Sequence, residues 1–183
     1  MDQYIKKTSI EGLLVLERPT FADNRGFFRE VFHADELESV IGQPFRIVQV
    51  NHSRSVAGVI RGIHADTWNK LVYPVSGSAF AAIADVRPDS PTFGKVETFT
   101  FDEDHRYGLF ISKNLGNSIG AIGPAPVDYF YLVDDYFRGQ TAVSVIYNDP
   151  DLNINWSVAN PILSDKDLKN PTLRSLYPEK FKS

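Results

Sequence analysis

The chain has 183 residues, of which 43% are hydrophobic and 23% are charged, and it carries a formal net charge of −4 and no cysteine. A chain of this length forms one domain with a full core, so we expect a single domain over residues 1–183. Mixed charges without a basic patch exclude a nucleic-acid-binding protein, and the lack of cysteine excludes disulfides and thiolate metal sites.

Two further exclusions concern secretion and membranes. The first residues lack the apolar run of a secretory signal, and no segment approaches the roughly 20 apolar residues that cross a bilayer. We therefore expect a cytoplasmic protein that binds neither membranes nor nucleic acid.

Short runs of β-branched and aromatic residues alternate with turn signals along most of the chain. The run at 27–32 follows an Asp-Asn-Arg-Gly turn, and the run at 70–75 meets a Ser-Gly-Ser turn. Many short strands at regular spacing, without helical periodicity between them, are typical of an all-β sandwich or barrel. We predict strands at 13–17, 27–32, 45–50, 56–60, 70–75, 79–84, 96–101, 108–111, 120–122, 129–133 and 142–147.

Two segments predict short helices. Hydrophobic residues at spacings i, i+3 and i+4 favour a helix over 34–41. The segment 164–168 begins with a Ser-x-x-Asp pattern that is typical of a helix start. The polar tail 171–183 is predicted to be loosely packed.

Among the histidines of the chain, His64 has the most distinctive neighbourhood. Arg61 lies before it and Lys70 after it. Alternate residues of a strand share a face, so Gly62 and His64 should share one face and Arg61 the other, unless a bulge intervenes. Two cations beside a histidine fit a site for an anion such as a diphosphate, whereas the alternative is a surface histidine among solvated charges.

A metal site at this histidine is disfavoured. Metal sites in β-barrels combine several histidines with a carboxylate, because these ligands must replace the water shell of the ion. Asp66 lies shortly after His64, but the sequence lacks a His-x-His pair. We therefore predict that no metal is bound.

A set of short segments follows the order and spacing of a known family. The set includes Arg-Gly-Ile-His at 61–64 and Leu-Ser-Asp-Lys-Asp at 163–167. Between Ile10 and Leu173 the chain therefore resembles the dTDP-4-dehydrorhamnose 3,5-epimerase family. The other segments are 21–30, 48–55, 70–72, 85–94, 148–150 and 154–156.

The resemblance implies a fold, an assembly and an activity. The fold is a cupin-type jelly-roll β-barrel with short peripheral helices, which works as a homodimer and needs no metal or organic cofactor. The activity is that of an isomerase that inverts C3, C5 or both in a 4-keto-6-deoxy sugar, a hexose or a heptose, linked to a nucleotide diphosphate. Such an enzyme acts in the cytoplasm in the biosynthesis of surface polysaccharide, including lipopolysaccharide and capsule.

The resemblance also implies roles for single residues. His64 falls on the base of the family, Asp167 on the carboxylate paired with it, and Tyr131 on the tyrosine acid. A proton next to a ketone is weakly acidic, so its removal needs a base and a group that stabilises the enolate oxygen, for which Lys70 is suited. The positions that hold the substrate are Arg25, Glu30, Gln49, Asn51, Arg61, Lys70, Asn117 and Lys166.

Several positions depart from the family. Asn117 stands where the family has a second active-site histidine, and asparagine can form hydrogen bonds but cannot carry a proton charge. Ala65 and Asp66 stand where the family has an aromatic residue and a glutamine. These departures leave open which nucleotide and which sugar are used.

Structural and functional alternatives remain. Asp167 could only complete the helix start at Ser164, and Tyr131 could be a core aromatic residue or be displaced in register by Phe130. One alternative function is a cupin that binds a sugar nucleotide without catalysis, which Asn117 favours. Another is a 4-keto sugar ketoisomerase, which requires a second histidine close to the first.

Overall fold

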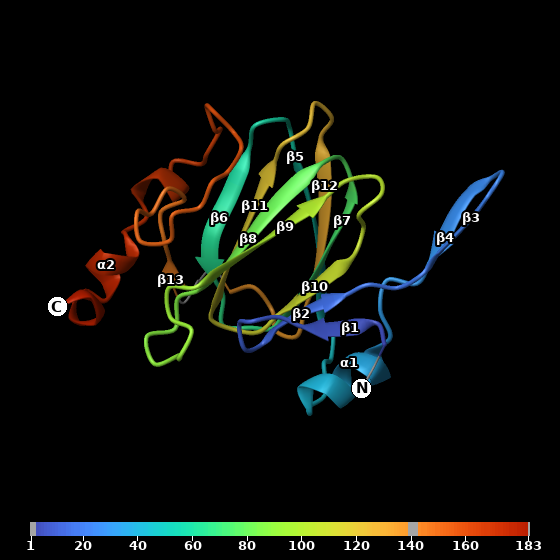
Figure 1. Ribbon diagram of the computed structural model, residues 1–183, viewed down its shortest axis with the longest axis horizontal. Helices are drawn as coiled ribbons and strands as arrows, with labels where there is room; N and C mark the ends of the chain where they lie inside the picture. Colours follow the sequence, from blue (N-terminus) through green and yellow to red (C-terminus); the bar gives the residue numbers. More distant parts are fainter. Residues whose placement is uncertain (1–2, 139–142, 183) are drawn as a thin grey trace.

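Strands with alternating hydrophobic residues form two antiparallel sheets that face each other (Figure 1). The structure is a computed structural model that describes residues 3–138 and 143–182. One sheet has the strand order β1 (Ile5–Lys7), β2 (Leu13–Leu16), β10 (Gly108–Ile111), β7 (Lys70–Ser76), β12 (Val127–Val133) and β5 (Gln49–Ser55). The other has the order β13 (Val143–Ser144), β6 (Ile60–Ala65), β11 (Leu115–Ala121), β8 (Ala79–Asp85) and β9 (Val96–Phe101).

The main hydrophobic core lies between the two sheets. Leu13, Val72 and Leu109 from the first sheet pack with Ile83 and Phe101 from the second, and all five are fully buried. Each such side chain contributes about 1.5–3 kcal/mol when it leaves water. The all-β prediction is confirmed.

Most predicted strands are found close to their expected limits, but those predicted at 45–50 and 56–60 are misplaced. The strands β1, β3 (Thr20–Asp23), most of β6 and most of β11 were not predicted. The strand predicted at 45–50 begins only at Gln49. The segment 56–60 is a turn that precedes β6, because Gly58 has a positive φ of 84° and reverses the chain. For the strand predicted at 142–147, the structure has β13 at Val143–Ser144, and residue 142 lies outside the described residues.

Helices are short and peripheral, as predicted. Helix α1 spans Ala34–Ile41, and the start predicted at 164–168 becomes the 3-10 helix η1 (Asp167–Lys169). The expectation of a loosely packed tail is wrong, because α2 (Leu173–Leu176) and η2 (Pro178–Phe181) pack their apolar residues against the body of the protein. None of the helices in residues 3–138 and 143–182 is long and apolar enough to span a membrane.

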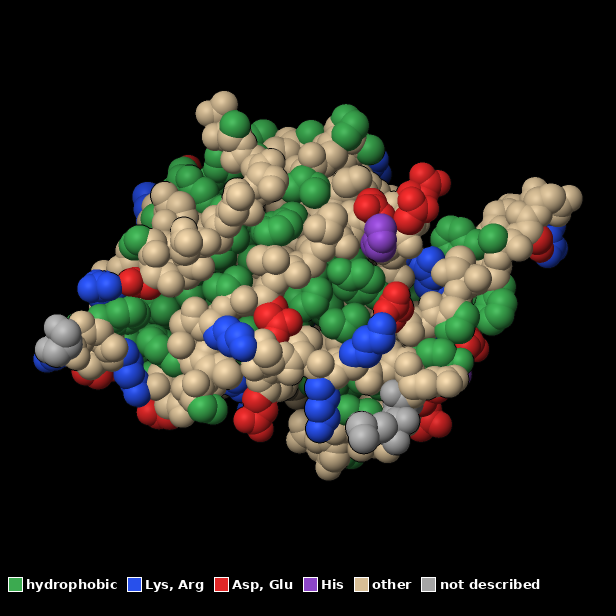
Figure 2. Space-filling model, in the orientation of Figure 1, with side chains coloured by type: hydrophobic (Ala, Val, Ile, Leu, Met, Phe, Trp, Pro, Cys, Tyr) green, Lys and Arg blue, Asp and Glu red, His purple; other side chains and the backbone are tan. Residues whose placement is uncertain are grey.

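A hairpin of β3 (Thr20–Asp23) and β4 (Gly26–Arg29) projects from the body (Figures 1 and 2). Its phenylalanine side chains are largely exposed, at 61% for Phe21, 65% for Phe27 and 63% for Phe28. At its base the buried Arg18 forms ion pairs with Glu30 and with Glu36 of α1. The base of the hairpin is therefore fixed, while its apolar face has no cover within one chain.

The loop between β8 and β9 is organised by a buried carboxylate. Asp85 is 0% exposed and accepts hydrogen bonds from the side chains of Arg87, Ser90 and Thr92. Burial alone would raise the pKa of Asp85, but these hydrogen bonds outweigh burial and lower the pKa from 3.8 to about 2. This loop has a structural role, since the network uses its polar groups internally.

We expect Asp85→Asn to lower the free energy of unfolding at pH 7 by about 2 kcal/mol, because a pKa held below that of the unfolded chain is a stabilising difference. This stabilisation is complete above pH 3.8 and is lost as the pH falls toward 2. Urea unfolding between pH 7 and pH 3 should show the gap between the two proteins narrowing at the acid end. Asp89→Asn in the same loop, where the side chain is 99% exposed, is the matched control. Equal stability of Asp85→Asn and the parent at pH 7 would contradict the prediction.

Candidate active site

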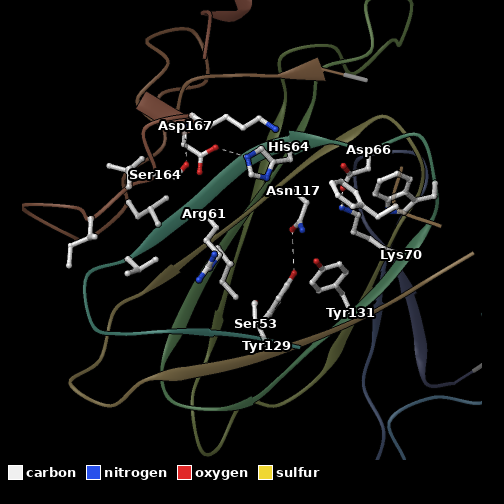
Figure 3. Close-up of a pocket in the computed structure, with 18 residues that line it drawn as sticks. Ser53, Arg61, His64, Asp66, Lys70, Asn117, Tyr129, Tyr131, Ser164 and Asp167 are labelled. Atoms are coloured by element: carbon white, nitrogen blue, oxygen red, sulfur yellow. Dashed lines mark hydrogen bonds and ion pairs between the residues drawn. The ribbon is translucent and has the colours of Figure 1, made fainter. Parts of the chain in front are cut away.

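A cavity of about 510 Å³ opens between the inner faces of the two sheets (Figure 3). Strands β6 and β11 supply one wall and β5, β7 and β12 supply the other, while the segment 162–167 closes one side. In the described ranges, no group of three or more His, Cys, Asp or Glu side chains is arranged to hold a metal ion. The polar residues that line the cavity are Ser53, Arg61, His64, Asp66, Lys70, Asn117, Tyr129, Tyr131, Ser164, Lys166 and Asp167.

A bulge in β6 brings Arg61 and His64 to the same cavity. In the ladder with β11, Gly62 and Ile63 together oppose the single residue Ser118. Gly62 has a φ of 130°, and a Cβ atom there would lie 2.3 Å from the Cβ of Ser118, so only glycine fits. In a regular strand Arg61 and His64 would lie on opposite faces. The bulge lets both of them line the cavity.

His64 is paired with a carboxylate from a distant part of the chain. Its Nε2 atom lies 2.6 Å from Oδ1 of the buried Asp167 (Figure 3). The Oγ of Ser164 accepts a hydrogen bond of 3.1 Å from the backbone N–H of Asp167. The helix-start pattern and the pairing with histidine therefore coexist, since the Ser164 hydroxyl fixes the turn while the Asp167 carboxylate faces the imidazole.

Tyr131 reaches the cavity from the opposite sheet. It lies on β12 and lines the cavity, whereas Phe130 faces the other way and stacks on His52 with ring centroids 4.5 Å apart. On this strand Tyr131 faces the cavity and Phe130 does not. Burial raises the pKa of Tyr131, the nearby Asp66 raises it further and Arg61 lowers it. The net rise keeps the phenol protonated at neutral pH.

Lys70 forms a buried ion pair beside the cavity. Its Nζ donates to the carboxylate of Asp66, and both side chains are almost completely buried. The charge of Lys70 is therefore balanced within the protein.

Two other cationic side chains, Arg61 and Lys166, line the cavity and differ from Lys70 in their partners. Arg61 donates to the hydroxyl of Ser55 over 2.9 Å and to the carbonyl of Arg54 over 3.1 Å. Within residues 3–138 and 143–182, neither Arg61 nor Lys166 has a carboxylate partner within ion-pair distance. Both charges are therefore available for an anionic group at the cavity.

The remaining predicted binding residues do not line the cavity. Arg25 lies at the tip of the hairpin and pairs with Asp23, and Glu30 is engaged by Arg18 at its base. Gln49 donates to Asn51 over 2.7 Å on β5. Within one chain, the structure thus brings together His64, Tyr131, Asp167, Arg61, Lys70, Asn117 and Lys166, and leaves Arg25, Glu30, Gln49 and Asn51 outside.

Some lining residues were not predicted from the sequence. Ser53, Trp68 and Phe137 line the cavity, and the rings of Trp68 and Phe137 meet edge to face with centroids 6.1 Å apart. The Oε1 of Gln49 accepts a hydrogen bond from the backbone N–H of Phe137, which ties β5 to this side of the cavity. No spacing or motif marks these residues, since single aromatic residues are equally typical of a core.

The chain is similar to known proteins over most of its length. The chain matches the family described as dTDP-4-dehydrorhamnose 3,5-epimerase over residues 7–175. It is similar to the dTDP-4-dehydrorhamnose 3,5-epimerase of Shigella flexneri, with 33% identity over 166 residues that cover 88% of this chain and 91% of the relative.

Solved structures with the same fold include epimerases of different specificity. A 4-keto-6-deoxy sugar epimerase from the novobiocin biosynthetic gene cluster of Streptomyces spheroides has a TM-score of 0.90 and 32% identity, with 96% of this chain and 90% of that chain covered. A 3'-monoepimerase from Streptomyces bikiniensis in complex with dTDP-quinovose has a TM-score of 0.87 and 31% identity, with 94% and 89% covered. These likenesses confirm the predicted cupin-type fold.

Proposed function

Because the chain belongs to the dTDP-4-dehydrorhamnose 3,5-epimerase family and is an isomerase of nucleotide sugars, we propose that it inverts C3, C5 or both in a nucleotide-linked 4-keto-6-deoxy sugar. The observation that carries the proposal is the position of two groups on facing sheets. His64 enters the cavity from β6 and Tyr131 enters it from β12 (Figure 3). A sugar ring between them has a base on one face and an acid on the other.

The first step is the removal of a proton by His64. Asp167 accepts a hydrogen bond from Nε2, which leaves Nδ1 as the atom that takes the proton from the carbon next to the ketone. As the C–H bond breaks, its electron pair forms an enolate and the ketone oxygen becomes negative. The Asp167 carboxylate holds the neutral tautomer beforehand and stabilises the imidazolium that forms.

The second step is the return of a proton by Tyr131 from the opposite face. Its raised pKa keeps the phenol protonated, so it can donate to the enolate carbon. The proton arrives on the face opposite to the one that lost it, and the configuration of the carbon is inverted. Arg61 and Lys166 bind the diphosphate, while Lys70 and Asn117 contact the sugar.

The decisive test is proton exchange with solvent. Incubation of the enzyme in heavy water with 4-keto-6-deoxy sugars linked to dTDP, GDP or CDP should place deuterium at C3, C5 or both, which NMR detects. Exchange with inversion at both carbons defines a 3,5-epimerase, and exchange with inversion at C3 alone defines a 3-epimerase. If no sugar exchanges although calorimetry shows that it binds, the epimerase proposal is wrong and the non-catalytic binding protein is favoured.

The ketoisomerase alternative has less support. It requires a second histidine near the first, and no other histidine of the described residues lines the cavity. The pairing of His64 with Asp167 also weighs against a protein that only binds sugar nucleotides, because a binding site gains little from a tautomer-fixed imidazole.

We further propose a cytoplasmic role in surface polysaccharide biosynthesis, with residues 1–183 acting as one domain.

We propose that the protein forms a homodimer through the projecting hairpin. Phe21, Phe27 and Phe28 expose an apolar surface that one chain cannot cover, and such a surface is typical of a protein contact. Arg25 at the tip and Glu30 at the base fall on positions that hold the substrate in the family. In such a dimer the hairpin of one copy would place Arg25 near the cavity of the other copy. Arg25 could then contact the substrate although it lies outside the cavity of its own chain.

Replacing Phe27 and Phe28 together by serine should weaken this dimer. Each phenylalanine loses roughly 1.5 kcal/mol or more of burial, so Kd should rise more than about a hundredfold. Analytical ultracentrifugation across a concentration series measures the shift toward monomer. Val56→Ser, which changes another exposed apolar residue, is the control and should leave Kd unchanged. An unaltered dimer in the hairpin variant would place the interface elsewhere.

A further inference from the structure

Asn117 lies directly beside the proposed base. In the ladder between β6 and β11, Asn117 is the partner of His64, so both side chains leave the sheet on the same face. Directly opposed residues of antiparallel strands have Cβ atoms about 4.5–5.5 Å apart. Asn117 is half-buried and lines the cavity, and Figure 3 shows it between His64 and Tyr131.

The orientation of the Asn117 amide is set by Tyr129. The Tyr129 hydroxyl donates to Oδ1 of Asn117 over 3.4 Å. Tyr129 is only 4% exposed, and its burial raises the pKa of the phenol, so the donor proton is retained. An amide whose oxygen accepts this hydrogen bond directs its NH₂ group away from Tyr129. The two N–H donors of Asn117 therefore point away from Tyr129, and the residue that carries them lines the cavity.

The charges around Asn117 indicate that its neutral amide can stabilise the enolate oxygen. Negative charge develops on the ketone oxygen as His64 removes the proton, and that oxygen is attached to the carbon next to the reacting one. The nearby Lys70 is neutralised by the buried Asp66, so its charge is shared before the substrate arrives. A fixed amide donor adjacent to the base supplies the stabilisation that a shared lysine charge supplies less well.

On the basis of the proposed epimerase function, we propose that Asn117 donates a hydrogen bond to the enolate oxygen and that Tyr129 is the positioning residue that orients the Asn117 amide for this contact. Asn117 thus stabilises the enolate without carrying a charge. Tyr129 acts only through Asn117, which makes the two residues energetically coupled.

A double-mutant cycle tests this coupling. Asn117→Ala should lower kcat by about 10²-fold, as the loss of one oxyanion donor does, with a smaller change in KM. Tyr129→Phe, which removes only the hydroxyl, should lower kcat on the order of tenfold. In the Asn117→Ala background the same change should cost less than about twofold. Tyr107→Phe removes a hydroxyl that donates to a backbone carbonyl outside the cavity and is the control. Equal costs in both backgrounds, or no cost of Tyr129→Phe alone, would overturn the proposal.

A second measurement does not depend on turnover. NMR of the side-chain amide of Asn117, assigned by its loss in Asn117→Ala, should show a downfield shift of one proton when a dTDP-linked 4-keto-6-deoxy sugar binds. In Tyr129→Phe the shift should be reduced. An unchanged amide signal on saturation of the wild type would overturn the inference even if exchange proceeds. Absence of exchange in the wild type would instead count against the epimerase proposal.

Discussion

Replacing His64 by asparagine is expected to lower the rate of deuterium exchange and of epimerisation by about 10³- to 10⁴-fold, the full contribution of a general base. Asparagine retains a polar group of similar size, so the cavity wall and the bulge in β6 should persist. Asparagine cannot accept a proton from carbon at neutral pH, so no imidazolium forms for Asp167 to stabilise. The rate is measured by NMR in heavy water with the best sugar nucleotide found for the parent.

The control for this experiment is His105→Asn. His105 is exposed and contacts Asp102 in the turn between β9 and β10, outside the cavity. Its replacement should leave exchange unchanged, and both variants should retain the unfolding temperature of the parent. If His64→Asn keeps more than a tenth of the parent rate, the base is another residue.

Replacing Tyr131 by phenylalanine should separate exchange from inversion. His64 can still remove the proton and return a deuteron on the same face, so label should enter the recovered substrate. Inversion needs the donor on the opposite face and should fall by roughly 10²- to 10³-fold. NMR distinguishes the two outcomes, since the labelled substrate and the inverted product have different coupling constants.

The hydroxyl itself, rather than packing, is at issue in this variant. Tyr131 packs beside Tyr129 with ring centroids 6.1 Å apart, and phenylalanine preserves that contact. Tyr107→Phe again serves as the hydroxyl control. Inversion at the parent rate in Tyr131→Phe would show that another group delivers the second proton, and a parallel loss of exchange would show that Tyr131 also takes part in proton removal.

The strands with continuous apolar runs could be predicted from the sequence, and those interrupted by small or polar residues could not. Strands β7 and β8 are buried along most of their length, so continuous apolar runs mark them. Most of β11 was missed because Gly116, Asn117 and Ser118 interrupt its apolar pattern. Small residues are needed there because the bulge of β6 approaches closely, as the contact between Gly62 and Ser118 demonstrates.

The pairing of His64 with Asp167 was accessible only through resemblance. His64 and Asp167 are 103 positions apart, and no local pattern relates a strand to a helix start across that distance. The pattern around Ser164 favoured a structural interpretation of Asp167, and the structure retains that function alongside the pairing. The buried partner of Lys70 was likewise not foreseen, because spacing alone cannot tell that Asp66 and Lys70 turn toward each other.

The placement of His64 and Tyr131 on facing sheets has a stereochemical consequence under the proposed roles. The fold then fixes which face of the sugar ring meets the base and which meets the acid, because the two sheets cannot exchange places. The wall that carries the imidazole decides which configuration of the carbon is accepted as starting material. A barrel of the same fold with histidine on β12 and tyrosine on β6 would accept the opposite configuration at the reacting carbon. Comparing the products of such a design with those of the parent would show that the positions of base and acid determine the product.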